Sequence, residues 1–171
     1  IIRELGPVLT ALMVSGRIGS AISAELGAME VSQQIEAMRA LGSDPLKKLV
    51  TPRLVALLIM LPLLTVAADI FGIIGGGISA SYIFSQDPNV FITSVRNGIT
   101  ANDIIGGVIK PIFFGLIIGG ISCYKGLSTT GGTVGVGRST IDAVVLSSIW
   151  VIIFDYFLAK AIQSILGVGI I

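Results

Sequence analysis

Four apolar stretches, each long enough to cross a bilayer as an α-helix, constrain this chain more than any other feature. They cover residues 7–29, 52–82, 104–124 and 140–166, and none shows the period-2 alternation of a membrane β-barrel. Charged residues make up only 12% of the sequence, about half of their share in a soluble domain. The sequence therefore predicts an all-α integral membrane protein, with residues 1–171 forming a single transmembrane domain.

Small residues and prolines indicate how these spans should pack. The first span is rich in glycine, alanine and serine around Arg17, which lets neighbouring helices approach closely. Gly115 and Gly119 form a GxxxG spacing in the third span. The second stretch is longer than one crossing needs, so we expect it to be tilted, or broken at Pro62 or in the glycine run 75–77.

Residues 31–41 are too polar and too short to span a membrane. Their apolar positions recur at helical spacing and form one stripe, made of Val31, Ile35, Met38 and Leu41. Polar residues, including Gln34, Glu36 and Arg39, occupy much of the remaining surface, and Gly42 ends the segment. This pattern predicts a short amphipathic helix, which could either couple the membrane domain to a soluble motor or lie on lipid.

The distribution of basic residues predicts the orientation of the chain. Four spans leave residues 30–53 and 125–139 on one side of the membrane, with six basic residues: Arg39, Lys47, Lys48, Arg53, Lys125 and Arg138. The other side has three: Arg3, Arg96 and Lys160. The positive-inside rule therefore places the amphipathic helix in the cytoplasm.

Ionisable residues inside the spans are candidate functional groups. Arg17 and Asp155 lie near the middle of their spans, whereas Asp69 and Lys110 lie closer to the outer side. Each such charge costs roughly 3 kcal/mol at mid-bilayer, so we expect these four to neutralise one another or to line a wet cavity. They would serve either a substrate path or the joining of helices. Glu25 faces the cytoplasmic boundary, where we expect it to pair with Lys47 or Arg53.

Several classes of function lack the residues they need. The chain has no histidine and a single cysteine, Cys123, so we expect no catalytic residues, no metal site and no enzyme activity. A net charge of +1 gives no electrostatic basis for binding nucleic acid. Residues Gly132–Ser139 read GTVGVGRS, close to a phosphate-binding loop, but Arg138 stands where lysine is required. No strand precedes them, and we expect a flexible loop there.

Several motifs resemble one family of membrane proteins. Residues 4–53 read ELGPVLTALMVSGRIGSAISAELGAMEVSQQIEAMRALGSDPLKKLVTPR, and LPLLTV (61–66), GVGRST (135–140) and FDYFL (154–158) follow. Together they resemble the MlaE/YrbE permeases, the membrane subunits of ABC transporters that move lipids between bacterial membranes. The resemblance implies that these spans are the second to fifth of five and that the chain, which starts without methionine, is N-terminally incomplete.

The resemblance also implies partners and residue roles. The 31–41 segment would be the coupling helix, which contacts the ATPase through Val31, Gln34, Ile35, Glu36, Met38, Arg39 and Leu41. The buried charges along the lipid path would be Arg17, Glu25, Asp69, Lys110 and Asp155. ATP and magnesium would bind to the partner ATPase, so no cofactor is expected in this chain.

The expected assembly is a permease homodimer in the bacterial inner membrane. It would include a cytoplasmic ABC ATPase, a periplasmic MCE-domain protein and, in some systems, a STAS-domain protein. Phospholipid would occupy a cavity between the two permease subunits, and the system would maintain outer-membrane lipid asymmetry. Two alternatives stay open: a different lipid, such as a sterol or fatty acid, or an ion-coupled secondary transporter with Asp69 and Asp155 as its relay.

Overall fold

The computed structural model describes residues 3–83, 87–99 and 101–166, and the elements in these ranges are all helices. The first long rod consists of α1 (Leu5–Val14), a π-helical turn η1 (Ser15–Gly19) and α2 (Ser20–Val31). The second consists of a π-helical turn η2 (Leu46–Val50) and α4 (Thr51–Ile83). The third and fourth are α6 (Ala101–Leu127) and α7 (Gly132–Leu166), and the short helices are α3 (Gln34–Ala40) and α5 (Pro88–Gly98).

All four predicted membrane-spanning stretches are helical. The segments long and apolar enough to cross a membrane are Leu5–Val31, Leu46–Ile83, Ile104–Leu127 and Gly132–Ile162. Each contains most of one predicted span and extends beyond it at one end or both. The predicted class, an all-α multi-pass membrane protein, is confirmed.

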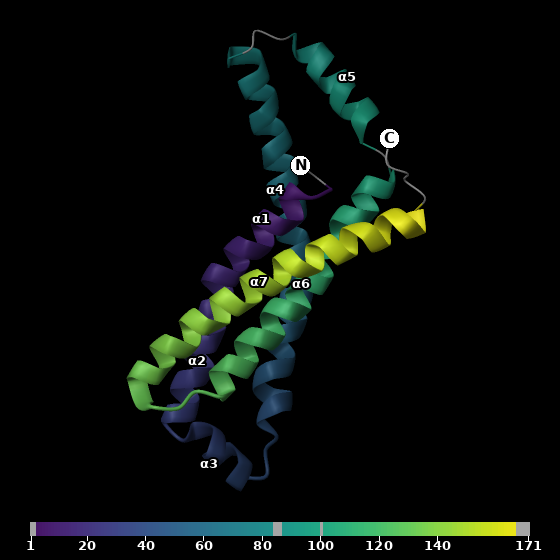
Figure 1. The fold of residues 1–171 in the computed structure, drawn as a ribbon. Helices are drawn as coiled ribbons and strands as arrows, with labels where there is room; N and C mark the ends of the chain where they lie inside the picture. Colours follow the sequence, from purple (N-terminus) through teal and green to yellow (C-terminus); the bar gives the residue numbers. More distant parts are fainter. Residues whose placement is uncertain (1–2, 84–86, 100, 167–171) are drawn as a thin grey trace.

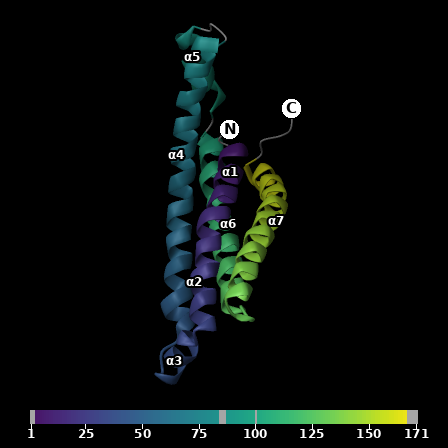
Figure 2. The same cartoon turned by 90° about the vertical axis from the view of Figure 1, so that its left-hand side faces the viewer.

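The long helices form a bundle with α6 at its centre. Helix α6 contacts α1, α2, α4 and α7. The α1–α2 rod, α4 and α6 run side by side, and α7 crosses them obliquely (Figures 1 and 2). Helix α3 and the turn from α6 to α7 lie at one end, called the α3 end below. Helix α5 lies at the other end, where it contacts α4 and then diverges from it (Figure 1).

Close helix contacts depend on small residues, as the sequence predicts. A β-carbon added to Gly115 would lie 3.1 Å from the carbonyl oxygen of Leu57, and one added to Gly119 would lie 2.6 Å from Leu54 Cδ2. The predicted GxxxG pair is therefore where α6 meets α4. Ser15 in the first rod and Ser147 on α7 share a buried hydrogen bond of 2.6 Å between their hydroxyl oxygens.

Helix α4 is continuous rather than broken. It runs through Pro62 and through the glycine run 75–77. Proline removes one backbone donor, and packed neighbours in a membrane protein accommodate that loss. Of the two alternatives expected for this long stretch, a tilt or a break, the structure therefore excludes the break.

The glycine-rich segment 132–139 is also helical, so the predicted flexible loop is wrong. Gly131 and Gly132 have φ angles of +89° and +69°, values that a residue without a β-carbon adopts readily. These two residues redirect the chain into α7, which starts at Gly132 instead of near residue 140. The segment is thus the first two turns of a membrane helix, not a phosphate-binding loop.

Candidate functional site

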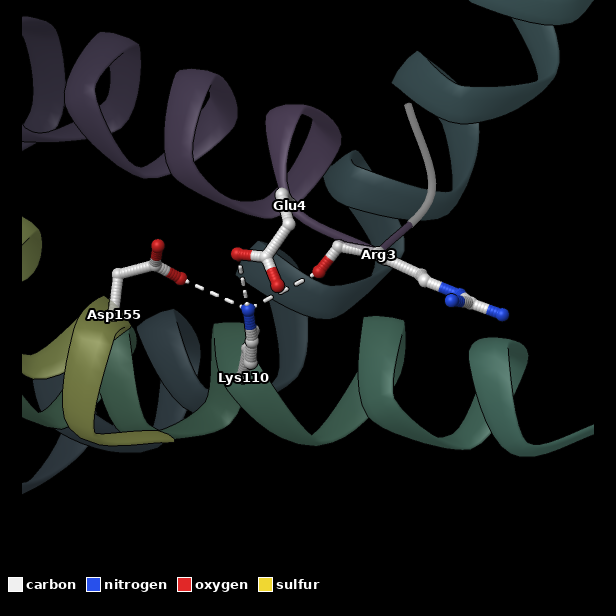
Figure 3. A network of polar contacts seen from close by, with 4 residues as sticks. All are labelled: Arg3, Glu4, Lys110 and Asp155. Atoms are coloured by element: carbon white, nitrogen blue, oxygen red, sulfur yellow. Dashed lines mark hydrogen bonds and ion pairs between the residues drawn. The ribbon is translucent and has the colours of Figure 1, made fainter. Parts of the chain in front are cut away.

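A buried lysine joins three parts of the chain near the start of α1. The side chain of Lys110, on α6, is 2% exposed. Its ammonium nitrogen donates to Glu4 Oε2 at 2.7 Å, to Asp155 Oδ1 at 3.0 Å and to the Arg3 carbonyl oxygen at 3.1 Å (Figure 3). An ammonium group has three donors, and all three are used here. We call these four residues the Lys110 cluster.

The Lys110 cluster compensates a positive charge that lies inside an apolar bundle. A buried ion is tolerated where an opposite charge and hydrogen bonds replace its water. The carboxylates stay partly accessible, with exposed side-chain fractions of 52% for Glu4 and 20% for Asp155. The cluster therefore connects the start of the first rod with α6 and α7. Its two carboxylates remain partly exposed at the surface of the bundle.

Of the four charges expected to neutralise one another, the structure brings together only Lys110 and Asp155. The partner that sequence reasoning missed is Glu4, immediately before α1. A usable signal was present: the first span begins on the outer side, and Lys110 lies in the outer third of its span. Glu4 and Lys110 were thus at similar depth.

Arg17 lies elsewhere, on a different surface. It is exposed within the turn η1 and forms no ion pair among the residues that the structure describes. By helix geometry it is about 20 Å from Glu4 along the rod. It lines an open groove of about 440 Å³ with Leu9, Thr10, Met13, Val14, Ile18, Leu64 and Ala68. The groove combines one cation with an apolar wall.

Asp69 is buried on α4, apart from these two sites. It is 7% exposed, and its Oδ1 atom has no hydrogen-bond partner within the described ranges. A β-carbon on Gly6 would overlap the Asp69 carboxylate, so the beginning of α1 packs directly on this group. Arg17 does not neutralise this carboxylate and instead lines the groove described above.

The α3 end is held by the predicted ion pair. Arg53 Nη2 lies 2.9 Å from Glu25 Oε2, and Arg53 Nη1 donates to the Leu49 carbonyl oxygen at 3.1 Å. The pair connects α2 to the start of α4, on either side of α3. Of the two partners expected for Glu25, the structure selects Arg53.

Helix α3 is shorter than the predicted 31–41 segment. Val31 ends α2, and Gln33, with a φ angle of +59°, separates the two helices. The apolar stripe is divided by burial: Ile35 is 1% exposed, Met38 is partly buried, and Leu41 is 84% exposed. Gln34, Glu36 and Arg39 are exposed. Ile35 thus anchors α3 to its own chain, and the outward surface consists of the polar residues and Leu41.

No group of three or more acidic, cysteine or histidine side chains with metal-binding spacing occurs within residues 3–83, 87–99 and 101–166. The polar groups that the structure does bring together, around Lys110, are suited to holding charge inside a membrane. Their arrangement supplies no nucleophile paired with a base.

Comparison with known proteins gives a consistent result. The family model described as Permease MlaE matches residues 1–161. A probable ABC transporter permease protein of Rickettsia typhi is 40% identical over 163 residues, which cover 95% of this chain and 63% of the relative. One of Synechocystis is 43% identical over 157 residues, covering 92% and 60%.

A plant relative extends the comparison to plastids. The chloroplastic protein TRIGALACTOSYLDIACYLGLYCEROL 1 of Arabidopsis thaliana is 41% identical over 158 residues, covering 92% of this chain and 45% of that protein. The chain therefore spans about three fifths of the bacterial relatives described above and less than half of the plant one.

Proposed function

Since the chain belongs to the MlaE permease family, we propose that it moves phospholipids between the inner and outer membranes of a bacterium as the permease subunit of an ABC transporter. A permease subunit is not itself the catalyst, and ATP with magnesium would be bound by a separate ATPase. The family match over residues 1–161 is the observation that carries this proposal. The lipid name of the plant relative supports a lipid cargo.

Helix α3 is the proposed contact with the ATPase. It sits between the two long helices α2 and α4, which the Glu25–Arg53 pair connects. A displacement of α3 would therefore be passed to both helices. Gln34, Glu36, Arg39 and Leu41 offer the exposed contact surface, with Val31 and Met38 at its border. Ile35 would act from inside, by fixing α3 to the bundle.

The proposed lipid path uses the groove that Arg17 lines. A guanidinium suits a phosphate group, and the apolar wall of the groove suits acyl chains. The Lys110 cluster, at the start of the same rod, would be the second polar site along this path. Glu25 would remain at the α3 end, where it serves the coupling of helices.

The proposed assembly is a homodimer in the bacterial inner membrane. Its partners would be a cytoplasmic ABC ATPase, a periplasmic MCE-domain protein and, in some systems, a STAS-domain protein. The apolar side chains exposed on α4, including Val55, Ile59 and Leu63, suit contact with lipid or with a second copy.

ATP dependence separates this proposal from ion-coupled transport. We would reconstitute the full-length permease with its copurifying subunits in vesicles and follow movement of fluorescent phospholipid. We expect movement with ATP and magnesium and none with a proton gradient alone. Transport driven by the gradient without ATP would instead support a secondary transporter. Replacing phospholipid with a fluorescent sterol or fatty acid tests the cargo in the same vesicles.

A further inference from the structure

Asp69 is a buried carboxylate whose role the proposed transport cycle does not yet explain. It is more than nine tenths buried, and its Oδ1 atom lacks a hydrogen-bond partner in the part of the chain that the structure describes. An unpaired charge in an apolar interior costs several kcal/mol. The carboxylate is therefore stable in its charged form only where a group with donors or positive charge offsets it.

Asp69 also lines a pocket between α4 and α6. The pocket has a volume of about 150 Å³, and its other lining residues are Val66, Ile70, Ile73, Ile104, Gly107 and Val108. None of these side chains can donate a hydrogen bond. Because Pro111 has no N–H, the carbonyl of Gly107 lacks its helical donor. The pocket thus combines one carboxyl side chain with walls that are otherwise aliphatic, next to a backbone carbonyl that lacks its helical donor.

The lysine of the neighbouring helix α6 is already committed. The three donors of Lys110 are used by Glu4, Asp155 and the Arg3 carbonyl. Arg17 lines the groove on the other side of α1 and α4, which includes Leu64 and Ala68 but not Asp69. A small cationic donor from outside the bundle would satisfy this pocket.

We propose that the pocket binds the primary ammonium group of a phospholipid headgroup, with Asp69 as its counter-charge. This inference rests on the proposed lipid transport, since a headgroup reaches this depth only inside the permease. A primary ammonium has three N–H donors that a carboxylate can accept, whereas a quaternary ammonium has none. The pocket therefore selects phosphatidylethanolamine over phosphatidylcholine.

Lipid retention measures this selection directly. The full-length permease with its copurifying subunits is placed in nanodiscs that contain equal parts of phosphatidylethanolamine, phosphatidylcholine and phosphatidylglycerol. Lipids retained after transfer to detergent are counted by native mass spectrometry. We expect the wild type to enrich phosphatidylethanolamine over phosphatidylcholine, and Asp69→Asn to lower that enrichment about tenfold, the effect of losing one charge-assisted contact.

Two further variants keep the result interpretable. Val108→Phe fills the pocket but leaves the carboxylate in place, and it should reduce the enrichment in the same way even if Asp69→Asn fails to fold. Asp142→Asn removes a carboxylate that pairs with Lys125 at 3.4 Å outside the pocket, and it should leave the enrichment unchanged.

The outcomes separate this inference from the function on which it rests. Retention of no phospholipid by any variant would contradict lipid transport itself. Retention with the same headgroup ratio in wild type, Asp69→Asn and Val108→Phe would overturn only the ammonium site. Free ethanolamine, added at millimolar concentration, should not displace the retained lipid. If it binds without phospholipid and depends on Asp69, the lipid headgroup is the wrong source.

Discussion

At the scale of single residues, Lys110 and Asp69 represent two ways of keeping a charge inside a membrane domain. Lys110 has two carboxylates and a carbonyl within 3.1 Å, so its charge is matched inside the chain. Asp69 has no comparable partners, and its Oδ1 atom accepts no hydrogen bond among the described residues. The first arrangement stabilises the fold, whereas the second leaves a site for a ligand.

Removing the ammonium of Lys110 should be strongly destabilising. Lys110→Met leaves Glu4 and Asp155 facing each other without a cation. Because both carboxylates are partly exposed, we expect a loss of about 1.5–3 kcal/mol, that of hydrogen bonds to charged groups. Denaturant unfolding in mixed micelles, followed by circular dichroism, measures the free energy of unfolding. The matched control is Lys125→Met, whose partly exposed pair with Asp142 should contribute about 0–1 kcal/mol. Equal losses for both lysines would contradict the assigned role of the cluster.

Gly6 should tolerate no side chain while Asp69 is present. A β-carbon there would overlap the Asp69 carboxylate, and overpacking of this kind costs about 1–3 kcal/mol. We expect Gly6→Ala to lower the melting temperature and Asp69→Ala to restore part of the loss in the double variant. Gly16→Ala serves as the control, because a β-carbon at Gly16 meets nothing within 4 Å. Additive effects of the two substitutions would show that the close approach is absent in solution.

At the scale of helices, the apolar pattern predicted the four spans but not how each helix is rotated about its axis. Depth follows from counting residues along a span, so the four spans and the Glu25–Arg53 pair were accessible from sequence. The partner of Lys110 depends on which way α1, α6 and α7 face, and no periodicity in one sequence sets that rotation. The rotation of α1 likewise decides that Arg17 lines a groove and pairs with neither Asp69 nor Asp155.

Helix ends were the other source of error, and glycine explains it. Residues 132–139 contain three glycines, which ordinarily weaken a helix. In α7, Gly135 lies so close to the Thr130 carbonyl that a β-carbon would clash. The turn that precedes the helix therefore requires glycine there, and this close local approach outweighs the weak helix preference of glycine.

The division of α3 into a buried and an exposed part leads to a prediction about coupling. Leu41→Asp places a charge on an 84% exposed position and should leave stability unchanged, yet reduce ATPase copurification about tenfold if Leu41 is a central contact. Ile35→Asp places a charge at a 1% exposed position and should lower the melting temperature. Pull-down and thermal unfolding measure the two effects. Undiminished ATPase binding by Leu41→Asp would remove this residue from the proposed interface.

At the scale of the whole molecule, burial is very unequal among the four spans. In the most apolar part of each, 44% of the third span is buried but only 22% of the second and 17% of the fourth. Helix α6 is thus the centre of the bundle, while α4 and α7 present apolar faces to their surroundings. A face of this kind is stable only against lipid or another apolar protein surface, so the fold requires a membrane and is compatible with a second permease copy.

Orientation in that membrane is the whole-molecule property on which coupling depends. The α3 end contains six basic residues and the α5 end three, so we expect α3 in the cytoplasm. Cys123 is the only native cysteine and is 2% exposed, which makes the chain suited to labelling at single introduced thiols. Leu41→Cys and Val90→Cys, at positions 84% and 56% exposed, report on the two ends.

A membrane-impermeant maleimide should distinguish these ends in spheroplasts. We expect Val90→Cys to react in intact spheroplasts, and Leu41→Cys to react only after the membrane is permeabilised. The unmodified chain is the control and should stay unlabelled under both conditions, because Cys123 is enclosed by the bundle. The reverse pattern would put α3 on the outer face, out of reach of any cytoplasmic ATPase. The positive-inside count and the coupling proposal would then fail together, since both require the same side of the membrane.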